Sequence, residues 1–144
     1  MLERSKVEVT PEFLNKAGAG FLPEYLGMVM TGISAGEVTC EVAIERRHMA
    51  LLNGALHAGT ALTLADTACG VGCFAYLPEG AVGFATIEVK SNLLSSARDG
   101  TLQCSAKAIH RGRSTHVWEA TVFHKESGRK IAVFLCTQFI MYPK

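Results

Sequence analysis

One nearly uncharged segment, from His57 to Phe74, constrains the fold of this chain more than any other feature. Its single charged residue is Asp66, which is also the only charged residue between Arg47 and Glu79. A segment of this length and composition predicts a helix packed in a core, where Asp66 loses part of its water. Because desolvation disfavours the charged form, we expect a raised pKa for this carboxyl, which suits a general base or nucleophile. The alternative is a structural acid bonded to backbone or hydroxyl groups at a subunit interface.

The overall composition predicts a folded domain without a nucleic-acid partner. With 144 residues, 49% hydrophobic and 19% charged, the chain is expected to form a single domain over residues 1–144. A net charge of +1 without a basic tract argues against general nucleic-acid binding. The first residues lack the apolar stretch of a secretory signal, and the five cysteines are odd in number and scattered. We therefore expect a cytoplasmic protein with reduced cysteines and, without a recognisable His/Cys ligand cluster, no metal and no resident cofactor.

The apolar stretch over residues 58–78 is long enough to raise the question of a membrane span. Its apolar character comes from Ala, Gly, Thr and Cys as much as from Leu, and Asp66 lies near its middle. A charge at the centre of a bilayer is costly. A central helix wrapped by a sheet explains the same pattern at lower cost, so we expect no membrane partner.

Turn residues and period-two alternation predict the other elements. Short helical turns broken by Gly and Pro are expected within residues 11–27, with Thr10 as an N-cap. Strands are expected over residues 28–35, 37–46, 82–94, 101–110, 114–124 and 130–142. Turn signals at 98–100, 111–113 and 125–129 predict consecutive hairpins. The fold class is therefore α+β, a mainly antiparallel sheet with one helix buried on one face.

The predicted helix opens with a motif that resembles a known family. It reads Gly54-x-x-His57-Ala-Gly59, continues to Asp66-Thr-Ala, and is followed by a strand that contains Thr86-Ile-Glu-Val-Lys. With the order of elements, this resembles hotdog-fold acyl-CoA thioesterases of the PaaI-like (phenylacetate-degradation) group, in the 4-hydroxybenzoyl-CoA thioesterase superfamily. The resemblance implies a hotdog fold, a curved, mainly antiparallel sheet wrapped around one long central helix. It also implies hydrolysis of a short-chain, medium-chain or aromatic acyl-CoA by a homodimer, with dimers stacked into a tetramer.

Two positions depart from the usual family pattern, Asn-x-x-Gly-x-x-His-Gly-Gly. Leu51 stands at the Asn position, and an Asn appears two residues later as Asn53. Either Asn53 takes over through a shifted loop, or this chain lacks that polar contact. Ala58 replaces the first Gly after the histidine, which matters little if this residue acts through its backbone N–H.

Spacing along the helix bears on how a site can form. His57 and Asp66 would point to opposite sides of a continuous helix, so they cannot form one catalytic pair there. The resemblance implies instead that two subunits share each site. The amides of Ala58 and Gly59, at a helix end with partial positive charge, would polarise the thioester carbonyl. Asp66 of the other subunit would attack the carbonyl or activate a water.

Thr86 matches a hydroxyl position that orients the attacking water in similar enzymes. Simple alternation places Thr86 on a polar face of its strand with Glu88, Lys90 and Asn92. The alternative for Thr86 is an ordinary strand residue.

The remaining candidates concern the two ends of the substrate. The CoA phosphates are assigned to Lys90, Arg111 and Arg113, with Ser114 as a local donor; a solvated turn is the alternative for the arginines. His57 and Gly54 are assigned to substrate binding; the alternatives are a structural histidine that braces the loop before the helix and a glycine needed for backbone geometry.

Residues further from the motif are assigned by strand and helix pattern. The acyl group of the substrate that the resemblance implies needs an apolar pocket, which we expect to be lined by Leu62, Cys69 and parts of the N-terminal segment. Trp118 is interpreted as a packing residue. The histidines in the strands are interpreted as surface or interface residues: His110, His116 and His124.

Two other functions stay open for a hotdog protein. Hydratases and dehydratases that act on acyl thioesters share the fold, but they place Asp and His together in a motif that this sequence lacks. A non-catalytic acyl-CoA-binding dimer is the second alternative, and Leu51 at the Asn position is compatible with it.

Overall fold

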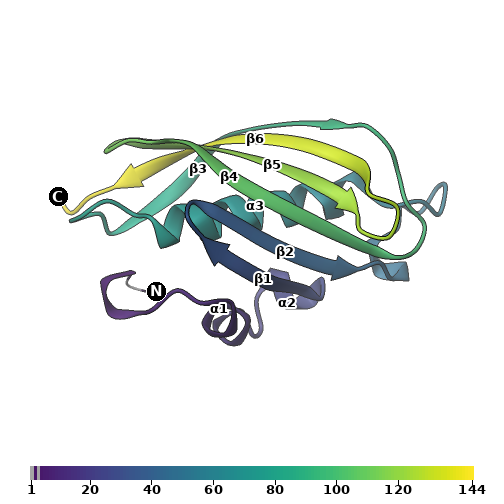
Figure 1. Cartoon of the computed structure of the whole chain (residues 1–144), viewed down its shortest axis with the longest axis horizontal. Helices are drawn as coiled ribbons and strands as arrows, with labels where there is room; N and C mark the ends of the chain where they lie inside the picture. Colours follow the sequence, from purple (N-terminus) through teal and green to yellow (C-terminus); the bar gives the residue numbers. More distant parts are fainter. Residues whose placement is uncertain (1, 3) are drawn as a thin grey trace.

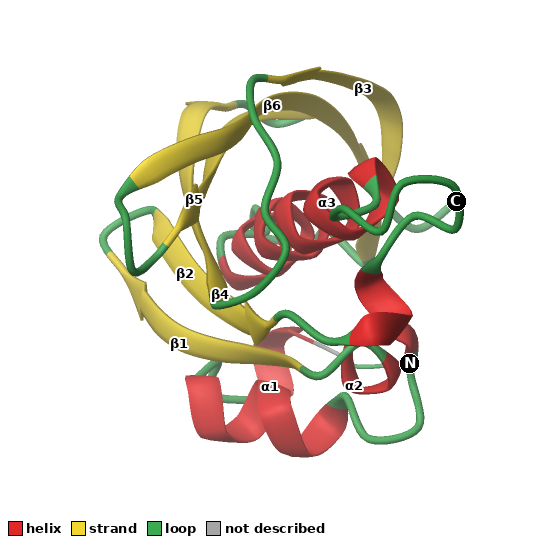
Figure 2. Ribbon diagram, turned by 90° about the vertical axis from the view of Figure 1, so that its right-hand side faces the viewer, coloured by secondary structure: helices red, strands yellow, loops and turns green. Residues whose placement is uncertain are grey.

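The structure, a computed structural model, describes residue 2 and residues 4–144. Short helical segments come first: η1 (Arg4–Lys6), α1 (Pro11–Ala17) and α2 (Leu22–Tyr25). Strands β1 (Met28–Ser34) and β2 (Glu37–Ala43) follow, then η2 (Arg46–His48) and the long helix α3 (Ala58–Ala75). The last strands are β3 (Gly83–Leu93), β4 (Thr101–Arg111), β5 (Thr115–His124) and β6 (Arg129–Met141). All six strands form a curved antiparallel sheet that wraps around α3 (Figure 1 and Figure 2).

The strand order shows how the chain closes around the helix. It is β1-β2-β4-β5-β6-β3, so β3 pairs with β6 at one edge while β4 pairs with β2. The predicted fold class, a curved antiparallel sheet around one long helix, is confirmed. The predicted hairpin at residues 98–100 is wrong, because the strands on either side of this turn are not neighbours. A local turn signal marks a change of direction and does not choose the next strand's partner.

The core forms where α3 packs on the concave face of the sheet. One face of the helix is buried, and its residues are mostly small: Thr60, Ala61, Leu64, Ala65, Ala68, Cys69, Gly72, Cys73 and Ala75. The sheet supplies a bulky partner in Trp118 of β5, which is fully buried. At Gly72 a Cβ atom would lie 2.4 Å from the Trp118 ring, so the helix must present bare backbone there.

Strand alternation decides which side chains face the helix. In β2 the predicted alternation is correct, since Val38, Cys40 and Val42 are buried. In β5 the same rule buries His116 with Trp118 on the inner side. The assignment of His116 to a surface or interface is therefore wrong. The pleat of a strand sets the direction of a side chain whatever its polarity.

The N-terminal segment covers the β1 edge of the sheet and lies below β1 in Figure 1. Thr10 caps α1 as predicted, its hydroxyl accepting from the N–H of Phe13 at 3.1 Å. Asn15 of α1 then bonds both backbone groups of Met30 in β1, at 3.0 and 2.8 Å. These bonds occupy backbone groups that an edge strand otherwise offers to another chain.

The composition of α3 reflects its place inside the sheet. By length and mean hydropathy (1.2) it is apolar enough to cross a membrane, and half of its residues are buried inside the protein. All five cysteines are buried and free of disulfide bonds. Within the described residues, no group of three His, Cys, Asp or Glu side chains is placed to hold a metal ion.

Gly72→Ala is expected to destabilise the protein by about 1–3 kcal/mol, because the added methyl overlaps the Trp118 ring. Gly70→Ala on the same helix is the matched control: a Cβ there meets Phe84 at an ordinary 3.5 Å, and alanine favours helix over glycine. Urea unfolding of both variants measures the difference. A Gly72→Ala protein as stable as Gly70→Ala would contradict this packing.

Candidate active site

Asp66 lies in the middle of α3, at the border between the buried face and a face that the sheet leaves uncovered. Its side chain is partly buried, and the hydroxyl of Thr86 on β3 lies 3.5 Å from its Oδ1. Burial raises the pKa of Asp66, and a hydrogen bond donated by the Thr86 hydroxyl to this carboxylate would act in the opposite direction. This is the half-desolvated carboxyl that the sequence predicted.

The uncovered face of α3 is where a ligand or a second chain can reach the helix. Its residues are partly exposed and small, hydroxylic or apolar apart from Asp66: Leu62, Thr63, Asp66, Thr67, Gly70, Val71 and Phe74. Asp66 lies at the border near β3. Thr67 and Val71 lie toward the N-terminal segment.

A β-bulge in β3 turns Thr86 toward the helix. Thr86 pairs with Gln138 of β6, and Glu88 pairs with the adjacent Thr137, so Ile87 is an extra residue. The extra residue shifts the alternation of inward and outward side chains by one position, so Thr86 lies on the inner side of the sheet and Glu88 on the outer side. The prediction that Thr86 shares one polar face with Glu88 is wrong for this reason. Simple period-two alternation does not reveal a bulge.

His57 braces the start of α3. Its Nδ1 accepts from the N–H of Gly59 at 2.9 Å, and its carbonyl accepts from the N–H of Thr60 at 3.0 Å. The Thr60 hydroxyl donates to the carbonyl of His48 at 3.1 Å, which ties the helix start to η2. The amide of Gly59 is thus engaged, whereas within residues 4–144 the amide of Ala58 has no hydrogen-bond acceptor.

The loop before α3 carries the two candidates for the family's Asn. Oδ1 of Asn53 accepts from the N–H of Ala55 at 3.0 Å, which forms a local turn. Gly54 has a φ of 59°, and Arg98 donates to the carbonyls of Asn53 and Gly54 at 3.1 and 2.9 Å. Leu51 is 96% exposed. Asn53 is therefore used within its own loop, and Leu51 projects an apolar side chain.

Two of the candidate phosphate ligands rest on aromatic rings. The guanidinium of Arg111 lies 4.7 Å from the centre of the Tyr76 ring, and that of Arg113 lies 5.4 Å from the Tyr142 ring. The Tyr142 hydroxyl also donates to the carbonyl of Arg113 at 2.8 Å. These contacts hold both cations near the β4–β5 turn.

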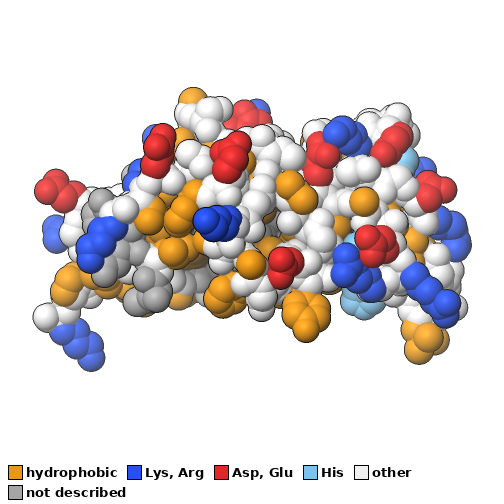
Figure 3. Space-filling view, turned by 90° about the horizontal axis from the view of Figure 1, so that it is seen from below, with side chains coloured by type: hydrophobic (Ala, Val, Ile, Leu, Met, Phe, Trp, Pro, Cys, Tyr) orange, Lys and Arg blue, Asp and Glu red, His pale blue; other side chains and the backbone are white. Residues whose placement is uncertain are grey.

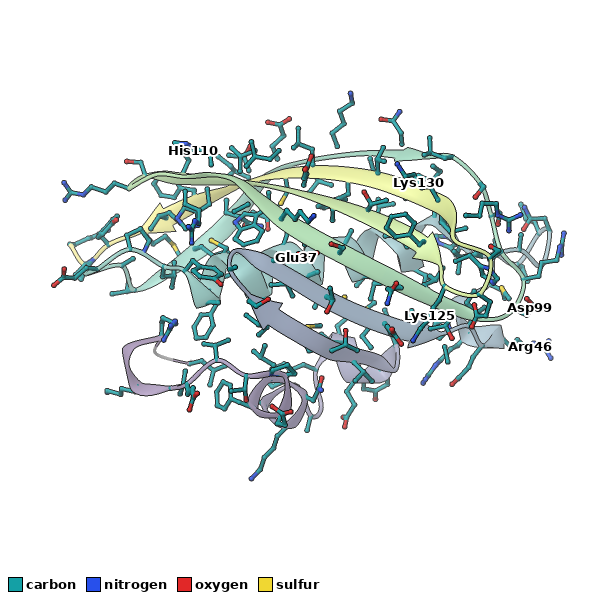
Figure 4. All side chains as sticks on the ribbon, in the orientation of Figure 1. Glu37, Arg46, Asp99, His110, Lys125 and Lys130 are labelled. Atoms are coloured by element: carbon teal, nitrogen blue, oxygen red, sulfur yellow. The ribbon has the colours of Figure 1, made fainter. Side chains whose placement is uncertain are left out.

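The cationic candidates are not gathered at the helix start within one chain. Figure 4 shows His110, near the β4–β5 turn, and Arg46, in η2 before α3, at opposite ends of the molecule. Lys90 is exposed on the outer side of β3, and Ser114 is exposed in the β4–β5 turn. A site that combines these cationic residues with the start of α3 therefore needs residues from both ends of the molecule.

A cavity of about 740 Å³ lies beside the uncovered face of α3. Its lining is mostly apolar and comes largely from the N-terminal segment and β1, including Leu14, Phe21, Met28, Met30, Thr67 and Val71. Figure 3, viewed from this side, shows hydrophobic side chains at the surface. The N-terminal segment takes part as expected, but Leu62 and Cys69 are not in the lining. Cys69 is fully buried against the sheet.

Gln138 is a polar residue near the site that the motif did not include. It is fully buried on the inner side of β6, and its Oε1 accepts from the Thr86 hydroxyl at 2.9 Å. Strand alternation is the sequence signal that could have identified Gln138, because this residue shares the inward face of β6 with buried Cys136 and Ile140. A polar residue at an inward position needs a hydrogen-bond partner.

Comparison with known proteins identifies the family. A family model described as Thioesterase superfamily matches residues 53–131, more than half of the chain. The chain belongs to the thioesterase superfamily. The matched region contains the start of α3, Asp66 and Thr86, and it confirms the predicted family and the predicted class of enzyme, a thioester hydrolase.

Individual thioesterases agree in sequence and in fold. A 1,4-dihydroxy-2-naphthoyl-CoA hydrolase from Listeria monocytogenes is 28% identical over 117 residues, which cover 81% of this chain and 92% of that protein. The structure of a mutant thioesterase from Pseudomonas aeruginosa superposes with a TM-score of 0.87 at 24% identity, covering 94% of this chain and 96% of that one. The PaaI protein of Escherichia coli superposes with a TM-score of 0.78 at 17% identity, covering 91% of each chain. The two structures show that the hotdog fold is shared.

Asp66→Asn is expected to raise the free energy of unfolding at neutral pH, because a neutral amide avoids the cost of a half-buried carboxylate. Folding raises the pKa of Asp66, so the charged carboxylate lowers the stability of the natural protein. This loss of stability is absent below the pKa of Asp66 in the unfolded chain, about 4, and grows as the pH rises through that value. Above the folded-state pKa the penalty is constant. Denaturant unfolding at pH 7 and at acid pH checks this. An Asn variant that is less stable at both would indicate a structural acid.

Proposed function

We propose that the protein hydrolyses an acyl-CoA to the free acid and CoA, with Asp66 as general base or nucleophile. The observation that carries this proposal is the half-buried Asp66 carboxyl, with its raised pKa, facing the Thr86 hydroxyl on an uncovered helix face. A base is most effective when its pKa approaches the working pH, and burial moves a carboxyl in that direction. Thr86 helps to hold the attacking water. CoA belongs to the substrate, so no metal or resident cofactor is proposed.

The electrophilic half of the site is proposed to come from a second copy of the chain. From Ala58 to Asp66 the helix rises about 12 Å, too far for both to contact one thioester carbonyl. The N–H of Ala58 at the partner's helix start is the first donor to the carbonyl oxygen. The N–H of Gly59 joins it only by leaving the cap formed by His57.

Strand β3 offers a surface for this second copy. It is an edge strand, paired with β6 on one side. Its apolar residues Ile87, Val89 and Leu93 are 61%, 46% and 46% exposed. Open strand edges and exposed apolar groups favour association. We propose a homodimer in which the two β3 strands meet at a twofold axis, and a tetramer built from two such dimers.

The substrate is proposed to extend from Asp66 in two directions. The acyl group follows the uncovered face of α3 toward the apolar cavity, which suits a medium-chain or aromatic group. The aromatic acyl-CoA in the name of the Listeria relative supports this choice. The CoA phosphates are proposed to contact Lys90, Arg111, Arg113 and Ser114, drawn from both subunits. A cytoplasmic location is also proposed.

The second candidate function is a dimer that binds acyl-CoA without hydrolysing it. The observation that favours it is Leu51, which stands at the family's Asn position and offers no polar group. Binding without thiol release is what distinguishes this function from hydrolysis.

Asp66→Asn is expected to lower the rate of thioester hydrolysis at least about 100-fold, because it removes the carboxylate that is proposed to take a proton from water. A panel of acyl-CoA thioesters, with thiol release as the readout, measures both enzymes and gives the acyl preference. Unchanged turnover in a folded Asp66→Asn dimer would remove Asp66 from the mechanism. Acyl-CoA binding without hydrolysis by the natural protein would favour the second candidate.

Mixed dimers test the shared site. One chain carries Asp66→Asn, and the other carries Gly59→Val, where even a Cβ would lie 2.9 Å from the capping Nδ1 of His57. Each homodimer is expected to be inactive, whereas the mixed dimer has one intact site and about half the activity of the natural dimer. No recovery in verified mixed dimers would show that each site lies within one chain.

A further inference from the structure

A row of three polar side chains crosses the inner side of the sheet beside α3. His116 of β5, Gln138 of β6 and Thr86 of β3 are successive cross-strand partners. His116 and Gln138 are fully buried, and Thr86 reaches the surface at the edge of the sheet. Polar groups in a core cost free energy unless they are bonded, so the bonds made by Gln138 are informative.

Thr86 has a single hydroxyl hydrogen and two acceptors within reach. Its Oγ1 lies 2.9 Å from Oε1 of Gln138 and 3.5 Å from Oδ1 of Asp66. The first distance is an ordinary hydrogen bond, and the second is at the limit of one. Because one hydrogen serves one strong bond, Gln138 takes it. The oxygen of Thr86 is then left with its lone pairs free on the side of Asp66.

Cys136 sets the orientation of the Gln138 amide. Nε2 of Gln138 donates to Sγ of Cys136 at 3.5 Å. Hydrogen bonds from the Cys69 thiol and from the backbone of Trp118 to the same sulfur help to lower the pKa of Cys136. A sulfur that already acts as an acceptor favours the NH₂ end of the amide. This leaves the oxygen end of Gln138 for Thr86.

We propose that Gln138 is a positioning residue for the hydrolysis proposed above, on which this inference rests. By binding the Thr86 hydrogen, it keeps the Thr86 oxygen as a hydrogen-bond acceptor. The attacking water then gives one hydrogen to Asp66 as a proton and donates the other in a hydrogen bond to the Thr86 oxygen. These two contacts aim the free lone pair of the water oxygen at the carbonyl carbon. The water oxygen bonds to that carbon, the C–S bond breaks, and Asp66 returns the proton to the leaving thiolate.

The opposite orientation of the hydroxyl would oppose the reaction. A Thr86 that donated to Asp66 would stabilise the carboxylate and make it a weaker base. It would also leave the water with one anchor instead of two. Among the described residues, the thiols of Cys69 and Cys136 are the titratable groups with a recorded electrostatic interaction with Asp66, while Glu88 faces outward beyond the bulge.

The test is Gln138→Met, which keeps the length of the side chain and removes the amide oxygen. The freed Thr86 hydrogen turns to Asp66, so the pKa of Asp66 is expected to fall in a carboxyl NMR titration of the dimer. The fall of kcat/KM at acid pH, which follows the pKa of Asp66, is expected to move to lower pH by the same amount. The pH-independent value of kcat/KM is expected to fall about tenfold. Gln138→Leu gives the same test if the Met variant does not fold.

Two comparisons separate positioning from packing. In a Thr86→Val background, Gln138→Met is expected to change neither the Asp66 titration nor the pH profile, because no hydroxyl is left to orient. Gln103→Met is the matched control elsewhere in the sheet, where the amide bonds Glu41 at 3.0 Å, and it should leave both readouts unchanged.

Two outcomes overturn the proposal. An unchanged or raised pKa of Asp66 in Gln138→Met would mean that Thr86 does not give its hydrogen to Gln138. An equal loss of activity with and without Thr86 would mean that Gln138 acts through packing. If the natural protein hydrolyses no thioester, the proposed function fails, and the titration of Asp66 still decides where the Thr86 hydrogen points.

Discussion

The burial of one face of α3 in the concave side of the sheet is the constraint on which the rest of this structure depends. The contact is close because the helix side is built of small residues, and Gly72 admits the ring of Trp118. Such a helix must be apolar over most of its surface, so a carboxylate is tolerated only where the sheet ends. Asp66 lies at that border, which gives it a partly buried environment and access from outside.

The same arrangement is the basis for the proposal that two chains share each site. A helix held lengthwise in a curved sheet keeps its N-terminal amides and its central carboxylate far apart along its axis. The sheet ends at β3, an edge strand whose exposed side chains lie beside Asp66. Helix geometry and the open edge therefore support the proposed homodimer, in which a second chain brings its own helix start.

Much of this could be predicted from local patterns. Period-two alternation located all six strands and the buried face of β2, and the long apolar run located α3 with Asp66 on it. Errors arose where a pattern depended on partners. The bulge at Ile87 reversed the expected direction of Glu88 relative to Thr86, and the turn before β4 joined strands that are not neighbours. Neither event leaves a local signal, because pairing depends on residues distant in sequence.

The sequence by itself determined the fold class, the family and the lone carboxylate, because hydrophobic period, turn chemistry and a short motif are all local properties. The tertiary structure alone decided what surrounds that carboxylate. Strand order brought β3 beside β6, the bulge turned Thr86 inward, and cross-strand register placed Gln138 against it. These contacts join residues up to 52 positions apart, and only the folded sheet sets the distances that choose which acceptor takes a single hydroxyl hydrogen.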